Sequence, residues 1–293
     1  MYKFQIVTDS CANLTDAVIE KYNLHILNLS YLLNGEEKVG YIKGQKIDHA
    51  DFYNKLRDKN NKASTSQATP ASTIDVARPI LEAGEDVLFV VLSSGLSGTF
   101  DAVQQGAKTL LEEFPERKII CVDSLCATSG IGALVLEAAR LRDEGKEIGE
   151  VAVVLDKIRH NVLHYFTIDD LFHLKRGGRL SAVKAIMGSA LNVKPLLTVS
   201  KEGKLVPIGK ARGRVKALDG LVDAVSAIEP SVSSTVYIVH ADVEKDAEYC
   251  AAQIREKHKG LTPEIVELNP VIGIHSGPGT VAIIFFGNKE RDV

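Results

Sequence analysis

The chain lacks any long apolar run. Its longest purely apolar stretches span about six residues, as at 87–92, whereas a membrane helix needs about 20. The N-terminal sequence reaches the polar Thr8-Asp9-Ser10 too early for a signal peptide. We therefore expect a cytoplasmic protein that does not span a membrane.

Cysteine is scarce in the sequence and does not occur in metal-binding patterns. The chain has 4 cysteines, and they form no CxxC pair. No set of cysteine and histidine has the spacing of a zinc site. We expect reduced thiols of a cytosolic protein, with no metal and no cofactor.

The stretch "VVLSSGLSGTF" (90–100) lacks the residue that defines a nucleotide triphosphate loop. It continues an apolar run into a Ser/Gly segment, which is typical of a buried strand leading through a loop into a helix. The GxxxxGK[ST] motif needs a lysine, and the next basic residue downstream is Lys108. The dinucleotide motif GxGxxG also fails, since Val135 takes the place of the third glycine after Gly130 and Gly132.

A serine hydrolase motif is nearly complete in the same stretch. The GxSxG elbow requires a second glycine two residues after the serine. Here Gly98 follows Ser97 directly, one residue early. His275, late in the chain, could still act as a base, because catalytic triads join distant residues. The alternative function is therefore a serine hydrolase that acts on acyl substrates through Ser97 and His275.

The first half of the chain alternates between strand and helix patterns. Strands are expected at 3–7, 24–29, 87–92 and 118–122, and helices at 15–22, 48–57 and 99–113. An Ala-rich helix is expected after Asp123-Ser124 and ends at about Gly145. Residues 31–42 predict a hairpin that turns at Asn34-Gly35, and 62–70 is expected to be a polar loop. This order predicts an α/β fold with a mostly parallel sheet flanked by helices.

Polar residues follow the strands of this predicted sheet. Asp9-Ser10, residues 93–98 and Asp123-Ser124 each stand at a carboxyl end, where ligands of such sheets bind. Hydroxyls together with a helix N-terminus suit a single negative charge such as a carboxylate. The candidate donors are Thr65, Ser66, Ser93, Ser94 and Ser97, with Gly98 beside them and His275 from a Gly/Pro loop at 273–280.

The second half mixes hairpins with βα units. A strand is expected at 164–168, a helical stretch at 169–191 and a hairpin at 194–213. Further strands are expected at 235–241, 263–268 and 280–286. The pattern predicts a mixed sheet in a second domain. We place an N-terminal α/β domain at 1–160 and a C-terminal α/β domain at 161–293.

Positive charge is concentrated in one segment. Residues 175–216 hold eleven Lys/Arg and one acidic residue, so this segment carries +10 and the rest of the chain −13. Such asymmetry indicates a face that meets an anionic partner. A nucleic-acid binder is a third hypothesis, but the segment has no aromatic residue on which bases could stack.

The motifs together resemble those of the DegV family, bacterial fatty-acid-binding proteins that serve as the lipid-binding subunit of a two-component fatty acid kinase. The resemblance runs through nearly the whole chain. Its motifs are "VTDSCANL" (7–14), "STSQATP" (64–70), "LSSGLSGTF" (92–100), "VDSLCATSGIG" (122–132), "LKRGGRL" (174–180), "KPLLTV" (194–199), "GKARGRVKAL" (209–218) and "HSGPG" (275–279).

The resemblance implies a non-catalytic protein of phospholipid metabolism. A long-chain fatty acid would lie with its acyl chain largely in the C-terminal domain. Its carboxylate would be held at the domain interface by Thr65, Ser97 and His275. Additional contacts at the ligand mouth are Ser66, Ser93, Ser94, Gly98 and Ser276.

The resemblance also implies a protein partner. An ATP-dependent fatty acid kinase would phosphorylate the bound carboxylate to an acyl phosphate, so the ATP site and the catalytic residues would belong to the kinase. Arg176 and Arg212 match positions that interact with the kinase or the phosphoryl group, and both lie in the +10 segment. Transient contact with a membrane surface would fit this role.

Overall fold

The computed structural model describes residues 4–179 and 192–293 and groups the chain into two compact units. The first unit comprises 1–31, 37–46 and 65–160, and the second comprises 32–36, 47–64 and 161–293. The sequence-based division assigned residues 32–36 and 47–64 to the N-terminal domain, whereas the structure groups them with the second unit. The domain boundary at residue 160 stays a prediction.

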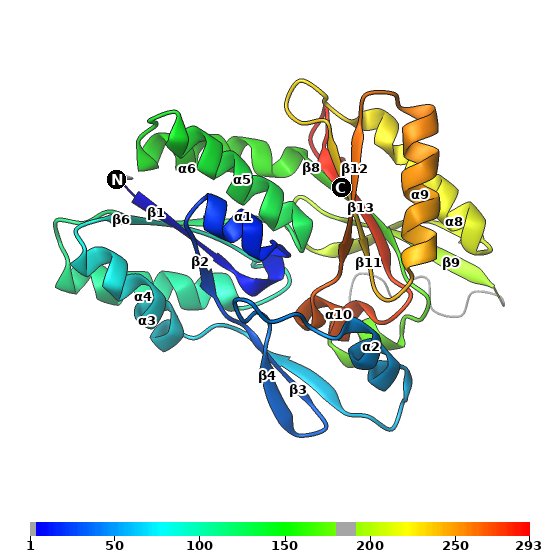
Figure 1. The fold of residues 1–293 in the computed structure, drawn as a ribbon, viewed down its shortest axis with the longest axis horizontal. Coiled ribbons are helices and arrows are strands. Elements are labelled where there is room, and N and C mark those ends of the chain that lie inside the picture. Colours follow the sequence, from blue (N-terminus) through cyan, green and yellow to red (C-terminus); the bar gives the residue numbers. More distant parts are fainter. Residues whose placement is uncertain (1–3, 180–191) are drawn as a thin grey trace. The chain divides into compact units, whose positions relative to one another are not determined.

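The first unit is built on a four-stranded parallel sheet of order β2-β1-β6-β7. Helices cover both faces, with α3 and α4 on one and α1, α5 and α6 on the other (Figure 1). The strands are β1 (Phe4–Asp9), β2 (Leu24–Leu27), β6 (Asp86–Val91) and β7 (Ile119–Asp123). The helices are α1 (Asp16–Lys21), α3 (Pro70–Glu82), α4 (Thr99–Glu113), α5 (Ser129–Asp143) and α6 (Ile148–Ile158).

Strand β6 lies inside this sheet because its sequence is almost continuously apolar. Residues 87–91 are fully buried, as expected for a strand that is covered on both faces. The strand order reverses beside β1, since the chain passes from β1 to β2 on one side and returns to β6 on the other. Ligands of open α/β sheets bind outside the carboxyl ends of the strands at such a reversal.

The second unit is built on a six-stranded mixed sheet of order β10-β9-β8-β13-β11-β12. Only β11 and β12 pair in parallel, and the other neighbours are antiparallel. The strands are β8 (Val162–Thr167), β9 (Val193–Val199), β10 (Leu205–Arg212), β11 (Thr235–His240), β12 (Thr262–Glu267) and β13 (Val281–Phe286). The helices are α2 (His49–Arg57), α7 (Phe172–Arg176), α8 (Arg214–Asp223), α9 (Glu244–Lys257) and α10 (Pro270–Ser276).

Helices α8 and α9 pack on one face of the mixed sheet and form its core (Figure 1). Leu218 and Val222 of α8 and Cys250 and Ile254 of α9 are buried against strands that include β13. The predicted fold class is therefore confirmed: an α/β chain with a parallel sheet flanked by helices and a mixed sheet further along the chain.

A small third sheet has the order β4-β3-β5. Its strands are β3 (Ser30–Leu33), β4 (Glu36–Val39) and β5 (Ala63–Ser66), and short 3-10 helices lie at Ser10–Ala12, Arg159–Asn161 and Ala224–Ala227. The hairpin predicted at 31–42 is confirmed, since Asn34 (φ 56°) and Gly35 (φ 87°) have the positive φ values of a type I′ turn. The loop predicted at 62–70 is wrong in part, because β5 occupies its first half.

The helical stretch predicted at 169–191 is shorter where the structure describes it. Helix α7 ends at Arg176, and Gly178 then adopts φ +74°, a left-handed conformation that stops the helix. Residues 180–191 of the predicted stretch lie outside the described residues.

Candidate functional site

Asp9 ties the ends of two parallel strands together in the first unit. Its carboxylate accepts N–H bonds from Cys11 at 2.8 Å and from Leu92 at 2.6 Å. Burial raises the pKa of Asp9 to about 6, although these backbone donors and the Cys11 side chain lower it. Asp9 thus lies at a strand end, as predicted, but its carboxylate binds backbone N–H groups of the loops that follow β1 and β6.

Asp123 and Ser93 also accept hydrogen bonds from backbone N–H groups, in the loops that follow β6 and β7. One oxygen of Asp123 accepts the N–H groups of Ser94 and Leu125, both at 3.1 Å. The buried hydroxyl of Ser93 accepts the N–H of Gly95 at 3.1 Å. These bonds hold the loop after β6 against the loop after β7. Ser94 is exposed.

Ser97 and Gly98 stand where this loop enters α4. Ser97 Oγ lies 2.9 Å from Thr99 Oγ1 and accepts the N–H of Thr99 at 3.2 Å. Neither partner is a base, so these contacts orient the hydroxyl as a donor or acceptor without activating it as a nucleophile. Gly98 is the N-cap residue of α4.

The segment after β5 packs against the start of α4. A Cβ on Gly98 would lie 2.4 Å from Gln67 Oε1, so the glycine leaves room for the Gln67 side chain. The N–H of Ala68 donates to Thr99 Oγ1 at 3.4 Å. Thr65 is half-buried on β5, two residues before Gln67. The structure thus brings the Thr65 and Ser97 segments together within the first unit, and Ser66 beside them is exposed.

His275 lies on the last turn of α10 in the second unit, so the loop predicted at 273–280 is wrong in its first half. Asn269 caps this helix by accepting the N–H of Val271 at 2.9 Å, and Pro270 occupies its first position. The Asn-Pro pair was the sequence signal that could have revealed α10. Tyr53 of α2 donates to the Leu268 carbonyl at 2.8 Å just before the helix.

The surroundings of His275 keep its imidazole neutral near pH 7. Burial lowers the pKa of His275 to about 4, and the positive charges of Arg179 and Arg176 add to this effect. The site in the second unit therefore combines a neutral imidazole with two guanidinium groups, a set that suits an anion. Ser276, the next residue, is buried.

The two predicted kinase-contact residues differ in their surroundings. Arg176 is half-buried at the end of α7, with its guanidinium 5.5 Å from the centre of the Phe172 ring. Its Nη1 donates to the Asn61 carbonyl at 3.4 Å. Arg212 is exposed at the end of β10. Arg176 is thus held close to the His275 site, whereas Arg212 is available on the surface.

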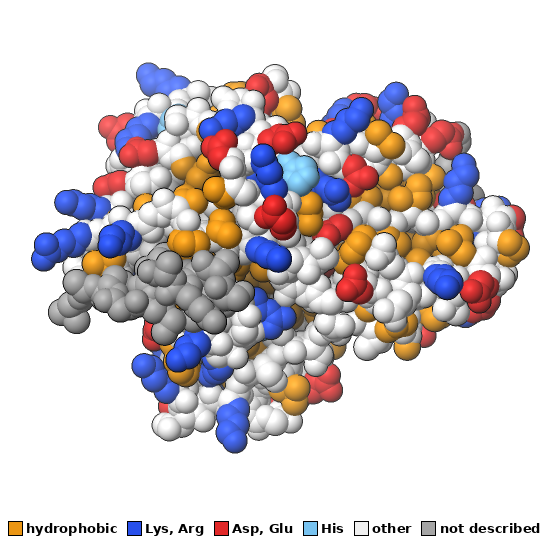
Figure 2. Space-filling model, turned by 180° about the vertical axis from the view of Figure 1, so that it is seen from behind, with side chains coloured by type: hydrophobic (Ala, Val, Ile, Leu, Met, Phe, Trp, Pro, Cys, Tyr) orange, Lys and Arg blue, Asp and Glu red, His pale blue; other side chains and the backbone are white. Residues whose placement is uncertain are grey.

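Part of the +10 segment is neutralised by acidic residues from elsewhere in the chain. Asp169 pairs with Lys194 at 2.8 Å and with Arg214 at 3.5 Å, and Arg214 also pairs with Asp246 at 2.8 Å. On the face drawn in Figure 2, basic and acidic side chains are interspersed. Among the described side chains, these ion pairs leave the segment less basic than its sequence charge indicates.

Sequence reasoning named no role for Gln67, Arg179 or Gly177. All three lie inside the motifs quoted for the resemblance, at 64–70 and 174–180. Their roles depend on which distant side chain each one meets, which the motif letters do not contain.

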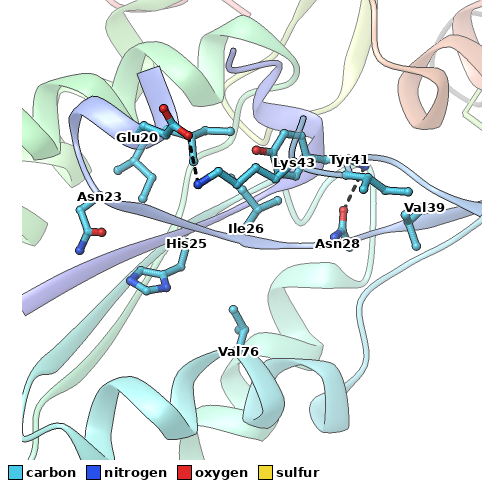
Figure 3. Close-up of a pocket in the computed structure, with 12 residues that line it drawn as sticks. Glu20, Asn23, His25, Ile26, Asn28, Val39, Tyr41, Lys43 and Val76 are labelled. Carbon is cyan, nitrogen blue, oxygen red and sulfur yellow. Dashed lines mark hydrogen bonds and ion pairs between the residues drawn. The ribbon is translucent and has the colours of Figure 1, made fainter. Parts of the chain in front are cut away.

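A separate pocket of about 530 Å³ opens beside the edge strand β2 (Figure 3). Glu20 and Lys43 pair across its rim at 3.1 Å, and the N–H of Tyr41 donates to Asn28 Oδ1 at 3.1 Å. Val76 reaches it from α3. None of the predicted site residues lines this pocket.

Across 4–179 and 192–293, no helix is long and apolar enough to cross a bilayer. Over the same ranges, no three His, Cys, Asp or Glu side chains gather where they could hold a metal ion.

The fold and the site define an α/β protein with hydroxyls at the strand ends of one sheet and a neutral histidine beside arginines in the other unit. The family model of DegV, described as an uncharacterised protein family, matches residues 3–288. The chain is 36% identical over 293 residues to the DegV domain-containing protein CPE0026 of Clostridium perfringens, covering 99% of this chain and 100% of that one. The chain belongs to the DegV family.

Solved structures of the family are similar over nearly the whole chain. A DegV family protein from Thermus thermophilus, described by its fatty acid binding, has a TM-score of 0.85 at 28% identity and covers 98% of this chain and 100% of its own. The fatty acid binding DegV family protein SAG1342 of Streptococcus agalactiae has a TM-score of 0.85 at 27% identity, with 99% and 100% covered. DegV of Bacillus subtilis, a fatty acid binding protein, has a TM-score of 0.81 at 28% identity, with 97% and 99% covered.

Proposed function

We propose that this protein binds a long-chain fatty acid in the cytoplasm and presents its carboxylate to a partner kinase for phosphorylation to an acyl phosphate. The observation that carries the lipid-binding part is the likeness to three fatty-acid-binding structures along nearly the entire chain. The protein acts as a carrier in this proposal, and the kinase supplies ATP and the catalytic groups.

Elementary energetics give a reason for such a carrier. Each exposed CH₂ of an acyl chain costs roughly 0.8 kcal/mol in water, so an enclosed apolar channel stabilises the bound chain. The carboxylate head group, by contrast, is stable in water, and burying it without hydrogen bonds costs free energy. The protein must therefore combine an apolar channel with a polar mouth.

The proposed polar mouth uses Thr65, Ser97 and His275, with Ser66, Ser93, Ser94, Gly98 and Ser276 as neighbours. The orientation of Ser97 by Thr99 supports a hydrogen-bonding role for its hydroxyl. A neutral His275 supports the same role, because it can donate one N–H to an anion without itself carrying charge. The nearby guanidinium groups favour the ionised form of a bound carboxylic acid.

The kinase part of the proposal rests on the resemblance and on the surface position of Arg212. An exposed arginine at the end of an edge strand can bind a phosphate or an acidic surface with two parallel N–H groups. Arg176, beside the proposed carboxylate site, can meet the phosphoryl group as it is transferred.

The experiment is a phosphorylation assay with fatty-acid-loaded protein, ATP and the fatty acid kinase of the same bacterium. We expect ATP-dependent acyl phosphate formation that requires the loaded protein. Arg212→Ala should lower the rate at least tenfold while fatty-acid affinity stays within twofold. Lys201→Ala, which removes an exposed charge from the same +10 segment, is the matched control and should leave the rate unchanged. Equal rates with and without the protein would refute the kinase partnership.

A further inference from the structure

Two neighbouring glycines follow α7, and the backbone explains only one of them. Gly178 adopts φ +74°, and a Cβ placed there would meet nothing within 4 Å. Gly177 adopts φ −77° and ψ −3°, an ordinary right-handed helical conformation. Alanine is more stable than glycine in that conformation. The presence of glycine at 177 therefore needs another cause.

The cause is the space that His275 occupies. A Cβ on Gly177 would lie 2.1 Å from His275 Nδ1, 3.1 Å from Cε1 and 3.2 Å from Cγ. Real non-bonded contacts of a Cβ are longer than 3.0 Å. Both residues lie in the second unit, one at the end of α7 and the other on the last turn of α10. The imidazole thus lies directly against the backbone of residue 177.

The same two segments meet at two further glycines. A Cβ on Gly277 would lie 2.5 Å from His173 Cδ2, and one on Gly279 would lie 2.2 Å from Asp169 Oδ2. Both of these glycines also have positive φ, at +84° and +85°, so the backbone requires them as well. Gly177 is the one among the three whose glycine identity follows from packing alone.

We propose that Gly177 is a positioning residue for His275. By leaving no side chain at this point, it lets the imidazole lie flush with the end of α7, beside Arg176 and Arg179. Nδ1 is the imidazole atom nearest to the point that a Cβ of residue 177 would occupy. The ligand part of this inference rests on the proposed function, whereas the placement of the imidazole does not.

The first test uses ligand-free protein and follows His275 by NMR between pH 4.5 and 8. In the wild type the imidazole stays neutral through pH 5.5, in keeping with its lowered pKa near 4. In Gly177→Ala the new methyl group displaces the ring towards solvent and away from the positive charges of Arg179 and Arg176. His173 packs against the same segment, and burial lowers its own pKa, so it adds no charge near pH 7. The pKa of His275 should then rise by at least one unit.

The control is Gly178→Asn, since asparagine tolerates positive φ and this position faces open space. It should leave the His275 titration unchanged. A His275 titration in Gly177→Ala identical to the wild type would overturn the positioning role. This comparison needs no ligand, so it stands even if fatty acid binding fails.

The second test is a double-mutant cycle on fatty-acid affinity. Gly177→Ala should weaken binding of a C16 or C18 fatty acid about tenfold. In a His275→Ala background the same change should have no further effect, because no imidazole remains to be displaced. An equal loss in both backgrounds would mean that Gly177 acts independently of His275 and would overturn the proposal. Failure of the wild type to bind would refute the proposed function instead.

Discussion

Ser97 and His275 have surroundings that fit the hydrogen-bonding role proposed for them. Ser97 Oγ is paired with another hydroxyl, and the pKa of His275 is lowered to about 4 by burial and by neighbouring arginines. A catalytic base works best with a pKa near the operating pH, and an imidazole with a pKa of about 4 is a weak base at pH 7. These properties favour hydrogen bonding to a carboxylate over nucleophilic catalysis.

Alanine substitutions test the hypothesis that Thr65, Ser97 and His275 form hydrogen bonds to the ligand carboxylate. Thr65→Ala, Ser97→Ala and His275→Ala should each weaken fatty-acid binding by about 1–3 kcal/mol, as expected for a lost hydrogen bond to a charged group. The measurement is a fluorescence titration at pH 7. Thr109→Ala, which removes an exposed hydroxyl from α4, should leave affinity unchanged. Wild-type affinity in all three variants would contradict the assignment of the mouth.

Motif spacing could identify single candidate residues. It could not identify the hydrogen-bond and packing partners that decide what each residue does. Asp9 was recognisable as a polar residue at a strand end. Its bond to the N–H of Leu92 joins residues 83 positions apart and depends on which strands become neighbours. The packing reason for Gly177 likewise appears only once α7 and α10 are in contact.

At the scale of elements, the carboxyl ends of β1 and β6 are joined through the buried Asp9. Each carboxylate oxygen accepts one backbone N–H. At pH 4.5 the folded Asp9 is mostly protonated, and its hydroxyl oxygen still has lone pairs that can accept an N–H. In Asp9→Asn that oxygen becomes an NH₂ group, a donor that faces another donor. We expect a loss of about 1–3 kcal/mol in the free energy of unfolding, measured by urea denaturation at pH 4.5. A loss below about 0.5 kcal/mol would contradict the claim that the hydrogen bonds of Asp9 stabilise the ends of β1 and β6.

The penalty of Asp9→Asn should also depend on pH. The pKa of Asp9 is raised from 3.8 to about 6 in the folded protein, so between these values the folded state binds more protons than the unfolded state. The free energy of unfolding then falls as pH rises through this window. The asparagine of the variant does not titrate, so the gap between the two proteins should narrow from pH 4 to pH 6. A gap that widens would mean that the folded pKa is lowered.

Most strands and helices could be predicted because their apolar periods are strong, as in β6 and α4. Two short elements were not predicted, although the Asn-Pro pair before α10 offered a signal for one of them. Strand β5 reads Ala-Ser-Thr-Ser, without the apolar alternation of a half-buried strand. Helix α10 is seven residues long and lies next to a Gly/Pro segment, so composition alone favours a loop. In both cases tertiary neighbours outweigh the local pattern.

At the scale of the whole molecule, the sequence could predict a parallel and a mixed sheet but not the order of their strands. Strand order depends on long-range pairing, such as that of β8 with β13, where Val281 opposes Thr167. Residues 47–64 also group with the second unit although they precede most of the first. Local sequence patterns do not show that the chain enters the second unit at 47–64 and then continues in the first unit at 65–160.

The most direct test of the central claim is the lipid content of the protein itself. The purified, folded protein is extracted with organic solvent and the extract is analysed by mass spectrometry, with protein concentration measured in parallel. The account predicts a long-chain fatty acid at about one molecule per chain, and less in His275→Ala. Repeated absence of fatty acid from well-folded wild-type protein, together with no uptake of added fatty acid, would contradict the account.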